Sequence, residues 1–127
     1  MLLTTAKHLT NKRKISSEQS FLITDLDVQD VIALNLTRAV RLCVDIAAHI
    51  VSESSLAPPS TMSESFVRLH ELGILNNDIE KKMINAVGFR NVAVHHYEEI
   101  DWNIVKSICE YHLDGFKQFA KMIDSIL

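Results

Sequence analysis

The residues best suited to chemistry gather at positions 88–97, which read Gly-Phe-Arg-Asn-Val-Ala-Val-His-His-Tyr. Arg90 carries a permanent positive charge on a planar fork of donors, a geometry that suits phosphate oxygens. Histidine is the side chain whose charge changes near neutral pH, so His95 or His96 could carry a proton during catalysis. Tyr97 adds a hydroxyl that can donate or accept a hydrogen bond or be modified. These groups together suit acid–base chemistry at a phosphate.

The spacing of these residues limits how they can act together. On an unbroken helix, His95 would lie about 140° around the axis from Arg90, whereas Tyr97 would return to about the same face. Arg90 and His95 could then meet at one phosphate only if the helix stops between them or if a second chain supplies one of the pair. Residues 92–94 are typical of an apolar helix end and residues 95–99 of the turn that follows it. Both routes therefore stay open.

The same residues carry a family resemblance. Arg90, four intervening residues, His95, one further residue and Tyr97 resemble the Arg-x4-His-x-Tyr motif of the HepT family, a branch of the HEPN ribonucleases. Asn91 is similar to the polar residue usual after the arginine and would support it. Residues 30–39 and 45–50 resemble the family's second helix, and the similarity covers most of the chain from about residue 25. The resemblance implies a HEPN-like bundle that works as a homodimer, paired with a minimal nucleotidyltransferase antitoxin.

Length and composition independently favour an all-α fold. The chain has 127 residues, enough for one domain with a single core, so we expect residues 1–127 to form one domain. Apolar residues make up 47%, and three glycines with two prolines offer few tight turns for a many-stranded fold. An up-and-down bundle of four to five helices is expected. The apolar spacing predicts helices in residues 2–20 and 28–51. Capping patterns at 61–64 and 77–80 predict the starts of two more helices. A last helix is predicted in residues 102–127, with Asp101 as its N-cap.

Charge and residue usage limit the partners and the compartment. The formal net charge of −3 gives no general attraction to nucleic acid, so RNA binding would need a local cluster, for which Lys81, Lys82 and Arg90 are candidates. Cys43 and Cys109 lie in apolar helical patterns that favour buried thiols in a reducing compartment. No apolar run reaches membrane-spanning length, and the first residues lack the pattern of a signal peptide. We therefore expect a cytoplasmic protein with no membrane association.

The histidines do not form a metal-binding pattern. The six are scattered, and neither a His-Glu-x-x-His nor a Cys-x-x-Cys spacing occurs. A glycine-rich phosphate loop is also missing from the sequence. We expect neither a metal nor a cofactor. His112 falls on the apolar face of the last predicted helix and is expected to be a core histidine with one hydrogen bond.

Several other side chains carry packing expectations. Asn35 lies inside an apolar stripe and is expected to hydrogen-bond a neighbouring helix or a partner chain. Asp45 and His49 are one helical turn apart and could pair. Gly88 lies in mid-helix, where it costs about 1 kcal/mol relative to alanine unless it permits the close approach of another helix. Val94 is expected to face inward.

The resemblance also implies a mechanism. The 2′-hydroxyl of RNA would attack the adjacent phosphate, Arg90 would neutralise the developing charge, and His95 would move a proton to or from the attacking or leaving oxygen. Because an acid and a base are both needed, a two-fold dimer would bring two copies of the motif together. His96 as the second proton carrier is the other option. Tyr97 would be the tyrosine that the antitoxin adenylylates, which would place AMP where the substrate phosphate binds; packing of its ring in the turn is compatible with this role.

Two functions are therefore in competition. The first is the toxin of a toxin–antitoxin pair, a metal-independent endoribonuclease that is silenced by adenylylation. The second is a non-catalytic helical accessory subunit that binds a nucleotidyltransferase or a nucleotide. The acidic balance and the N-terminal residues favour the second, and the complete set of Arg90, Asn91, His95 and Tyr97 favours the first.

Overall fold

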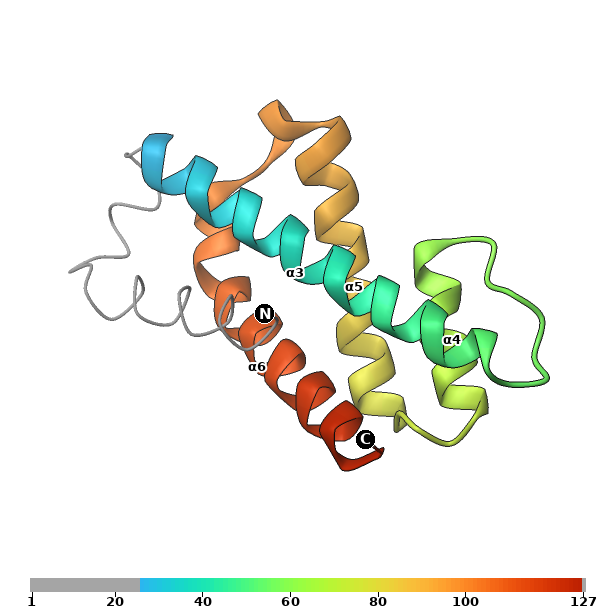
Figure 1. The fold of residues 1–127 in the computed structure, drawn as a ribbon. Coiled ribbons are helices and arrows are strands. Elements are labelled where there is room, and N and C mark those ends of the chain that lie inside the picture. The colour runs from blue at the N-terminus through green and yellow to red at the C-terminus, as the bar shows by residue number, and fades with distance from the viewer. Residues whose placement is uncertain (1–25, 127) are drawn as a thin grey trace.

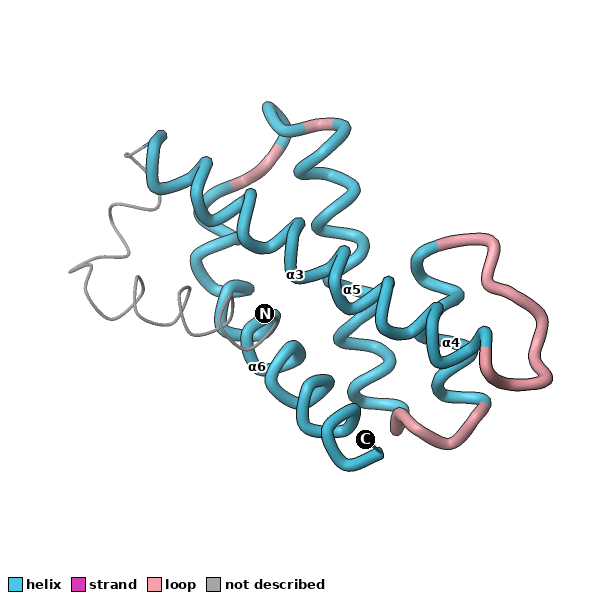
Figure 2. The backbone as a smooth tube through the Cα atoms, in the orientation of Figure 1, coloured by secondary structure: helices cyan, strands magenta, loops and turns pink. Residues whose placement is uncertain are grey.

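The computed structural model describes residues 26–126, without the side chains at positions 26, 104 and 106–110. This part of the chain contains helices and loops and no strand (Figure 2). Its elements are α3 (Leu26–Ser52), α4 (Met62–Glu71), α5 (Asn77–His95), the short 3-10 helix η1 (Tyr97–Glu99) and α6 (Trp102–Ile126). The predicted all-α bundle is confirmed. The helix predicted in residues 2–20 lies outside the described residues.

The core forms where α3 crosses the other helices. α5 and α6 run side by side in opposite directions, and α3 lies across both and reaches α4 (Figure 1). Phe66 of α4 meets Phe119 of α6 edge to face, with ring centroids 5.7 Å apart, an arrangement favoured by the aromatic quadrupole. Side chains that are almost completely buried come from all four α-helices: Leu36, Val40, Cys43, Phe66, Leu69, Met83, Phe116 and Phe119.

Local sequence signals fix the ends of α4. The Glu64 N–H donates to Oγ1 of Thr61 at 3.1 Å, and the Thr61 N–H donates to the Glu64 carboxylate at 3.1 Å. This reciprocal pair is the capping box predicted at residues 61–64. At the other end, Gly73 adopts φ +78, and its N–H donates to the carbonyl of His70. A residue with a Cβ would be strained there, so Gly73 stops the helix as its sequence position indicates.

The starts of α5 and α6 test two further capping predictions. The cap of α5 is Asn76, whose side-chain oxygen accepts from the Ile79 N–H at 2.8 Å. The capping pattern predicted at residues 77–80 was therefore placed one residue too late. Asp101 was predicted to cap the last helix, and its carboxylate accepts from the Asn103 N–H at 3.0 Å, as predicted.

The inward orientation predicted for Val94 is wrong, and Asn35 shows no bond to a neighbouring helix. Asn35 donates to the carbonyl of Val31 at 2.9 Å, a bond within its own helix, and the alternative bond to a partner chain stays a prediction. Back-bonding to the residue four positions earlier satisfies this amide N–H without a tertiary partner. Val94 is 49% exposed, because the last turns of α5 extend beyond the core formed by Ile79, Met83, Ala86 and Val87 of the same helix.

The predicted Asp45–His49 pair is also wrong. Asp45 pairs with Arg41 at 3.3 Å, and His49 pairs with Glu53 at 2.9 Å. Arg41, Asp45 and His49 lie at successive i, i+4 positions of α3 and Glu53 follows directly after its end, so Asp45 and His49 each have two neighbours at the same spacing. Both contacts formed join a basic and an acidic residue four positions apart, and both are exposed.

Two polarisable side chains lie in the core as expected. Burial raises the pKa of the Cys43 thiol, which lies outside the reach of solvent. Cys109 falls among the side chains that are not described. His112 is buried between the rings of Phe89 and Tyr111, and burial lowers its pKa to about 4. Its Nδ1 has no hydrogen-bond partner among the described residues, so the predicted bond is not found at that nitrogen.

Candidate functional site

Helix α5 runs without a break through the whole Arg90–His95 segment. It ends only at His96, whose N–H donates to the carbonyl of Val92 at 2.8 Å while its own backbone turns to φ −140 and ψ 49. The route in which the helix stops between Arg90 and His95 is therefore wrong. Because both residues lie on one continuous helix, their side chains leave the axis about 140° apart. Within one subunit they diverge.

Arg90 presents a guanidinium that no described carboxylate neutralises. It is half-buried, and its Nη1 donates to the side-chain oxygen of the adjacent Asn91 at 3.1 Å. Among the described side chains it has no ion pair. The amide of Asn91 can orient the fork without cancelling its charge, so the guanidinium is left available to an anion such as a phosphate.

The two adjacent histidines have different surroundings. His95, at the last position of α5, is exposed and makes no hydrogen bond or ion pair with the described residues. Nδ1 of His96 lies 3.9 Å from Glu99, and the donor atoms of His96, Glu98 and Glu99 all lie within 4.8 Å of one another. Two carboxylates near His96 repel a phosphate, whereas His95 makes no ion pair with a described residue. Exposed acidic groups of this kind do not by themselves indicate a metal site.

Tyr97 is held in the turn that follows α5. Its hydroxyl donates a short hydrogen bond to Oδ1 of Asp30, and its ring packs edge-on against Trp102 with centroids 5.8 Å apart. Burial, together with the hydrogen bond and the negative charge of Asp30, raises the pKa of Tyr97 to about 12. A phenol with this pKa is protonated at neutral pH. The packing of the ring in the turn agrees with one of the two interpretations made from the sequence.

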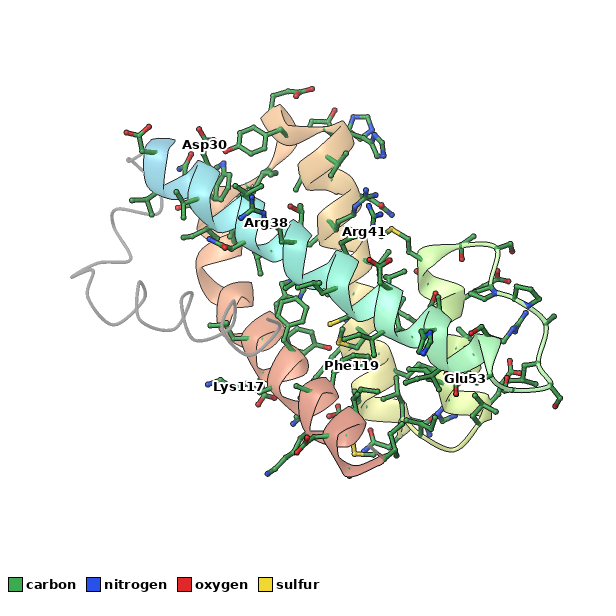
Figure 3. The ribbon with its side chains drawn as sticks, in the orientation of Figure 1. Asp30, Arg38, Arg41, Glu53, Lys117 and Phe119 are labelled. Atoms are coloured by element: carbon green, nitrogen blue, oxygen red, sulfur yellow. The ribbon has the colours of Figure 1, made fainter. Side chains whose placement is uncertain are left out.

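Asp30 was not singled out from the sequence as a neighbour of this site. It lies on the second turn of α3, near the start of the helix in Figure 3, and 67 residues separate it from Tyr97. An aspartate near a helix start is adequately explained by favourable interaction with the helix dipole. Only the tertiary structure, which brings Tyr97 of η1 to the first turns of α3, could reveal the contact.

The predicted basic cluster is smaller than expected. Nζ of Lys82 lies 2.7 Å from Asp114 and 3.2 Å from Asp78, and the hydrogen bond to Asp114 is the main cause of its raised pKa. These carboxylates neutralise Lys82, so it adds little attraction for a nucleic acid. Lys81 stays exposed.

Helix α3 carries a further exposed cation. Arg38, labelled in Figure 3, is exposed and has no ion pair with a described residue, whereas Arg41 pairs with Asp45. Its position on the flank of the apolar stripe of α3 was the only available signal, because a sequence pattern does not reveal which cations are paired.

The last turns of α5 carry exposed residues on more than one side. A Cβ built on Gly88 would meet nothing within 4 Å, so no described helix of this chain makes the close approach that was one interpretation of this glycine. Val92 and Val94 are 37% and 49% exposed. By helix geometry Gly88 and Val92 share the side of His95, whereas Val94 lies on the side of Arg90. Exposed apolar side chains beside polar groups that have no described ion pair are typical of a surface that another molecule covers.

A sequence model described as "Ribonuclease HepT-like" matches residues 2–123. The chain belongs to the HepT-like ribonuclease family. The predicted family and enzyme class, a ribonuclease, are thereby confirmed.

None of the helices described in residues 26–126 combines the length and the apolar character that crossing a membrane requires.

Two relatives and one solved structure show the extent of the similarity. An "mRNA nuclease HepT" from Shewanella oneidensis is 35% identical over 99 residues, which are 78% of this chain and 74% of that protein. A "tRNA nuclease HepT" from Aphanizomenon flos-aquae is 30% identical over 87 residues, 68% of this chain and 59% of that protein. A tri-AMPylated HEPN toxin of Shewanella oneidensis, solved in complex with its MNT antitoxin, superposes with a TM-score of 0.86 at 30% identity, over 98% of this chain and 94% of that one.

Proposed function

We propose that this chain is the toxin of a toxin–antitoxin pair and a metal-independent endoribonuclease that acts as a homodimer. Arg90 and His95 from two copies would gather in a cleft between the subunits. The observation that carries this proposal is the unbroken helix α5, which makes the two side chains diverge within one subunit while both lack a charged partner among the described residues. A second copy related by a two-fold axis can supply the missing convergence.

The surface of α5 supports such a pairing. The exposed Val92 and Val94 lie on the same turns as the two candidate catalytic residues, and Gly88 leaves room for a helix of a second copy to approach closely. A two-fold interface repeats each of these features on both sides. Burial of the valines would offset the cost of association, and Arg90 and His95 would be drawn toward the same cleft.

The chemistry follows from the residue types. The 2′-hydroxyl of an RNA substrate attacks the adjacent phosphorus, the new O2′–P bond forms, and the bond to the 5′-oxygen breaks. Arg90, oriented by Asn91, neutralises the charge that develops on the phosphoryl oxygens. One His95 removes the proton of the attacking hydroxyl, and the His95 of the second copy protonates the leaving oxygen. The carboxylates beside His96 make it the lesser candidate for either role. The reaction needs no metal and no cofactor.

RNA is the proposed substrate class because the relatives carry the names mRNA nuclease and tRNA nuclease. The site acts on a backbone phosphate and a 2′-hydroxyl, which every RNA offers.

We infer that residues 1–127 work as one domain in the cytoplasm. The described residues include no helix able to span a membrane, which fits that location.

The proposed regulation is adenylylation of Tyr97 by a minimal nucleotidyltransferase antitoxin. The solved relative is a tri-AMPylated toxin in complex with an MNT antitoxin. In this chain Tyr97 follows His95 by two residues, so an attached AMP would bring a phosphate and a bulky base next to the catalytic pair. Charge competition and steric exclusion would both prevent RNA from binding.

Replacement of the two candidate catalytic residues tests the nuclease proposal. Arg90→Ala and His95→Ala are each expected to abolish RNA cleavage in the presence of EDTA and to relieve growth arrest in cells. His49→Ala is the matched control, because His49 is an exposed histidine on α3 that pairs with Glu53. Cleavage that survives His95→Ala would refute the mechanism and favour the accessory-subunit alternative.

A mass measurement tests the modification. After co-expression with a minimal nucleotidyltransferase antitoxin, the intact chain is expected to gain one or more AMP units, and Tyr97→Phe to gain none. A wild-type chain without added mass would refute this part of the proposal and leave the nuclease part standing.

A further inference from the structure

One carboxylate from a distant helix holds the hydroxyl of Tyr97. Asp30, on the second turn of α3, accepts the hydrogen bond of the phenol across 67 residues of sequence. On its other side the ring meets Trp102 at the start of α6, with centroids 5.8 Å apart. The phenol is therefore held by α3 and α6, and its oxygen donates to Asp30, a group that can accept a proton. Figure 3 shows Asp30 near the start of α3.

A proton acceptor matters because a neutral phenol is a weak nucleophile. Transfer of a nucleotidyl group to Tyr97 requires its oxygen to attack phosphorus, and the proton must leave as the new bond forms. Partial burial and the nearby negative charge raise the pKa of Tyr97 to about 12, so the free phenolate is scarce at neutral pH. A base must therefore lie within hydrogen-bond reach of the oxygen.

The other titratable groups near Tyr97 are less well placed. His96 and Glu98 flank it along the chain, and His96 is engaged with Glu99 at 3.9 Å. The Tyr97 hydroxyl makes no hydrogen bond to any of these three side chains, and it donates one to Asp30. Trp102 has no group that accepts a proton. Asp30 is the base in position among the described residues.

We propose that Asp30 orients Tyr97 and accepts its proton during adenylylation, an inference that rests on the proposed role of Tyr97 as the acceptor. The phenolic oxygen attacks the α-phosphorus of a nucleoside triphosphate held by the partner nucleotidyltransferase. The bond from oxygen to α-phosphorus forms, the bond from α-phosphorus to the oxygen shared with the β-phosphate breaks, and pyrophosphate leaves. The proton passes to Asp30 and from there to solvent.

The rate of AMP addition tests this role. The chain is incubated with its nucleotidyltransferase, ATP and Mg²⁺, and intact mass is followed over time between pH 7 and 9. Asp30→Asn can still accept a hydrogen bond but cannot take a proton, so its rate near pH 7 is expected to fall about 100-fold or more. Its rate should then rise about tenfold per pH unit, because hydroxide must remove the proton, while the wild-type rate stays nearly flat.

Two further variants separate a chemical role from a structural one. Asp30→Glu keeps a carboxylate and is expected to lower the rate while it retains the flat pH profile. Asp45→Asn is the matched control, an exposed aspartate on the same helix that pairs with Arg41, and is expected to behave as wild type. Should Asp30→Asn fail to fold, as judged by circular dichroism, the pH profile of Asp30→Glu still decides the matter, because a steep profile in that variant contradicts the proposal.

The outcomes distinguish this inference from the proposed function beneath it. If wild type gains AMP and Tyr97→Phe does not, but Asp30→Asn matches the wild-type rate and profile, only the role of Asp30 is overturned. A slow Asp30→Asn with a flat profile also overturns it, since the residue would then act on structure alone. If wild type gains no AMP, or Tyr97→Phe gains as much, the acceptor assignment and the role of Asp30 fall together.

Discussion

A heterodimer with one catalytic histidine offers a sharp test of the shared cleft. On α5, five residues of rise and a rotation of about 140° separate the Cα atoms of Arg90 and His95 by about 9 Å, with their side chains diverging further. A single subunit offers only one His95, so it cannot supply both an acid and a base to one phosphate. If the cleft takes both histidines from two copies, removal of one imidazole should disable the whole dimer.

The expected magnitude follows from the role of the missing group. Loss of a general acid or base costs about 10²–10⁴ in rate, so a dimer of one wild-type copy and one His95→Ala copy should retain about 1% of wild-type activity or less. If each subunit had its own complete site, the same heterodimer would retain about half.

The assay requires purified heterodimers. Two copies with different affinity tags are co-expressed, isolated by two successive purifications, and assayed for the initial rate of cleavage of total cellular RNA per dimer. A heterodimer of wild type with His49→Ala controls for tags and handling and should have full activity. A retained activity near one half in the His95→Ala heterodimer would refute the shared cleft.

Three other predictions concern the scaffold. Val94→Asp should leave the unfolding free energy of the subunit within about 0.5 kcal/mol, because the side chain is exposed, but should weaken the homodimer in sedimentation velocity; an unchanged dimer would exclude this surface from the interface. Gly88→Ala should raise the free energy of unfolding in urea by about 1 kcal/mol, because a Cβ at position 88 meets nothing within 4 Å. Gly115→Ala should raise it by less, because a Cβ at position 115 would lie 3.2 Å from Cβ of Lys82. Equal effects of the two substitutions would contradict the packing of α5 on α6. Burial lowers the pKa of His112 from its ordinary value of 6.5 to about 4, so the unfolded state binds more protons and stability is lost as the pH falls from about 6.5 to 4, by about 3 kcal/mol in total. His112→Leu should show a shallower loss of melting temperature over that range, and parallel curves for the two proteins would speak against a buried neutral imidazole.

Sequence patterns predicted the features that depend on neighbours within one or two helical turns. The capping box of Thr61 and Glu64 and the cap at Asp101 are formed as expected, because each needs only a side chain and backbone groups a few residues away. Local reasoning was weaker where a residue has two equivalent neighbours. Asp45 has Arg41 one turn before it and His49 one turn after, and its choice of Arg41 was not predicted.

The sequence by itself determined the helices found in residues 26–126, the order of Arg90, His95 and Tyr97, and through them the family. Only the tertiary structure decided that α5 runs unbroken from Arg90 to His95, that Val94 faces outward, and that Lys82 is neutralised by Asp114. The contact between Asp30 and Tyr97 belongs to the same group. The physical reason is that helix caps and periodicity arise from bonds within a turn, whereas these contacts depend on where one helix crosses another.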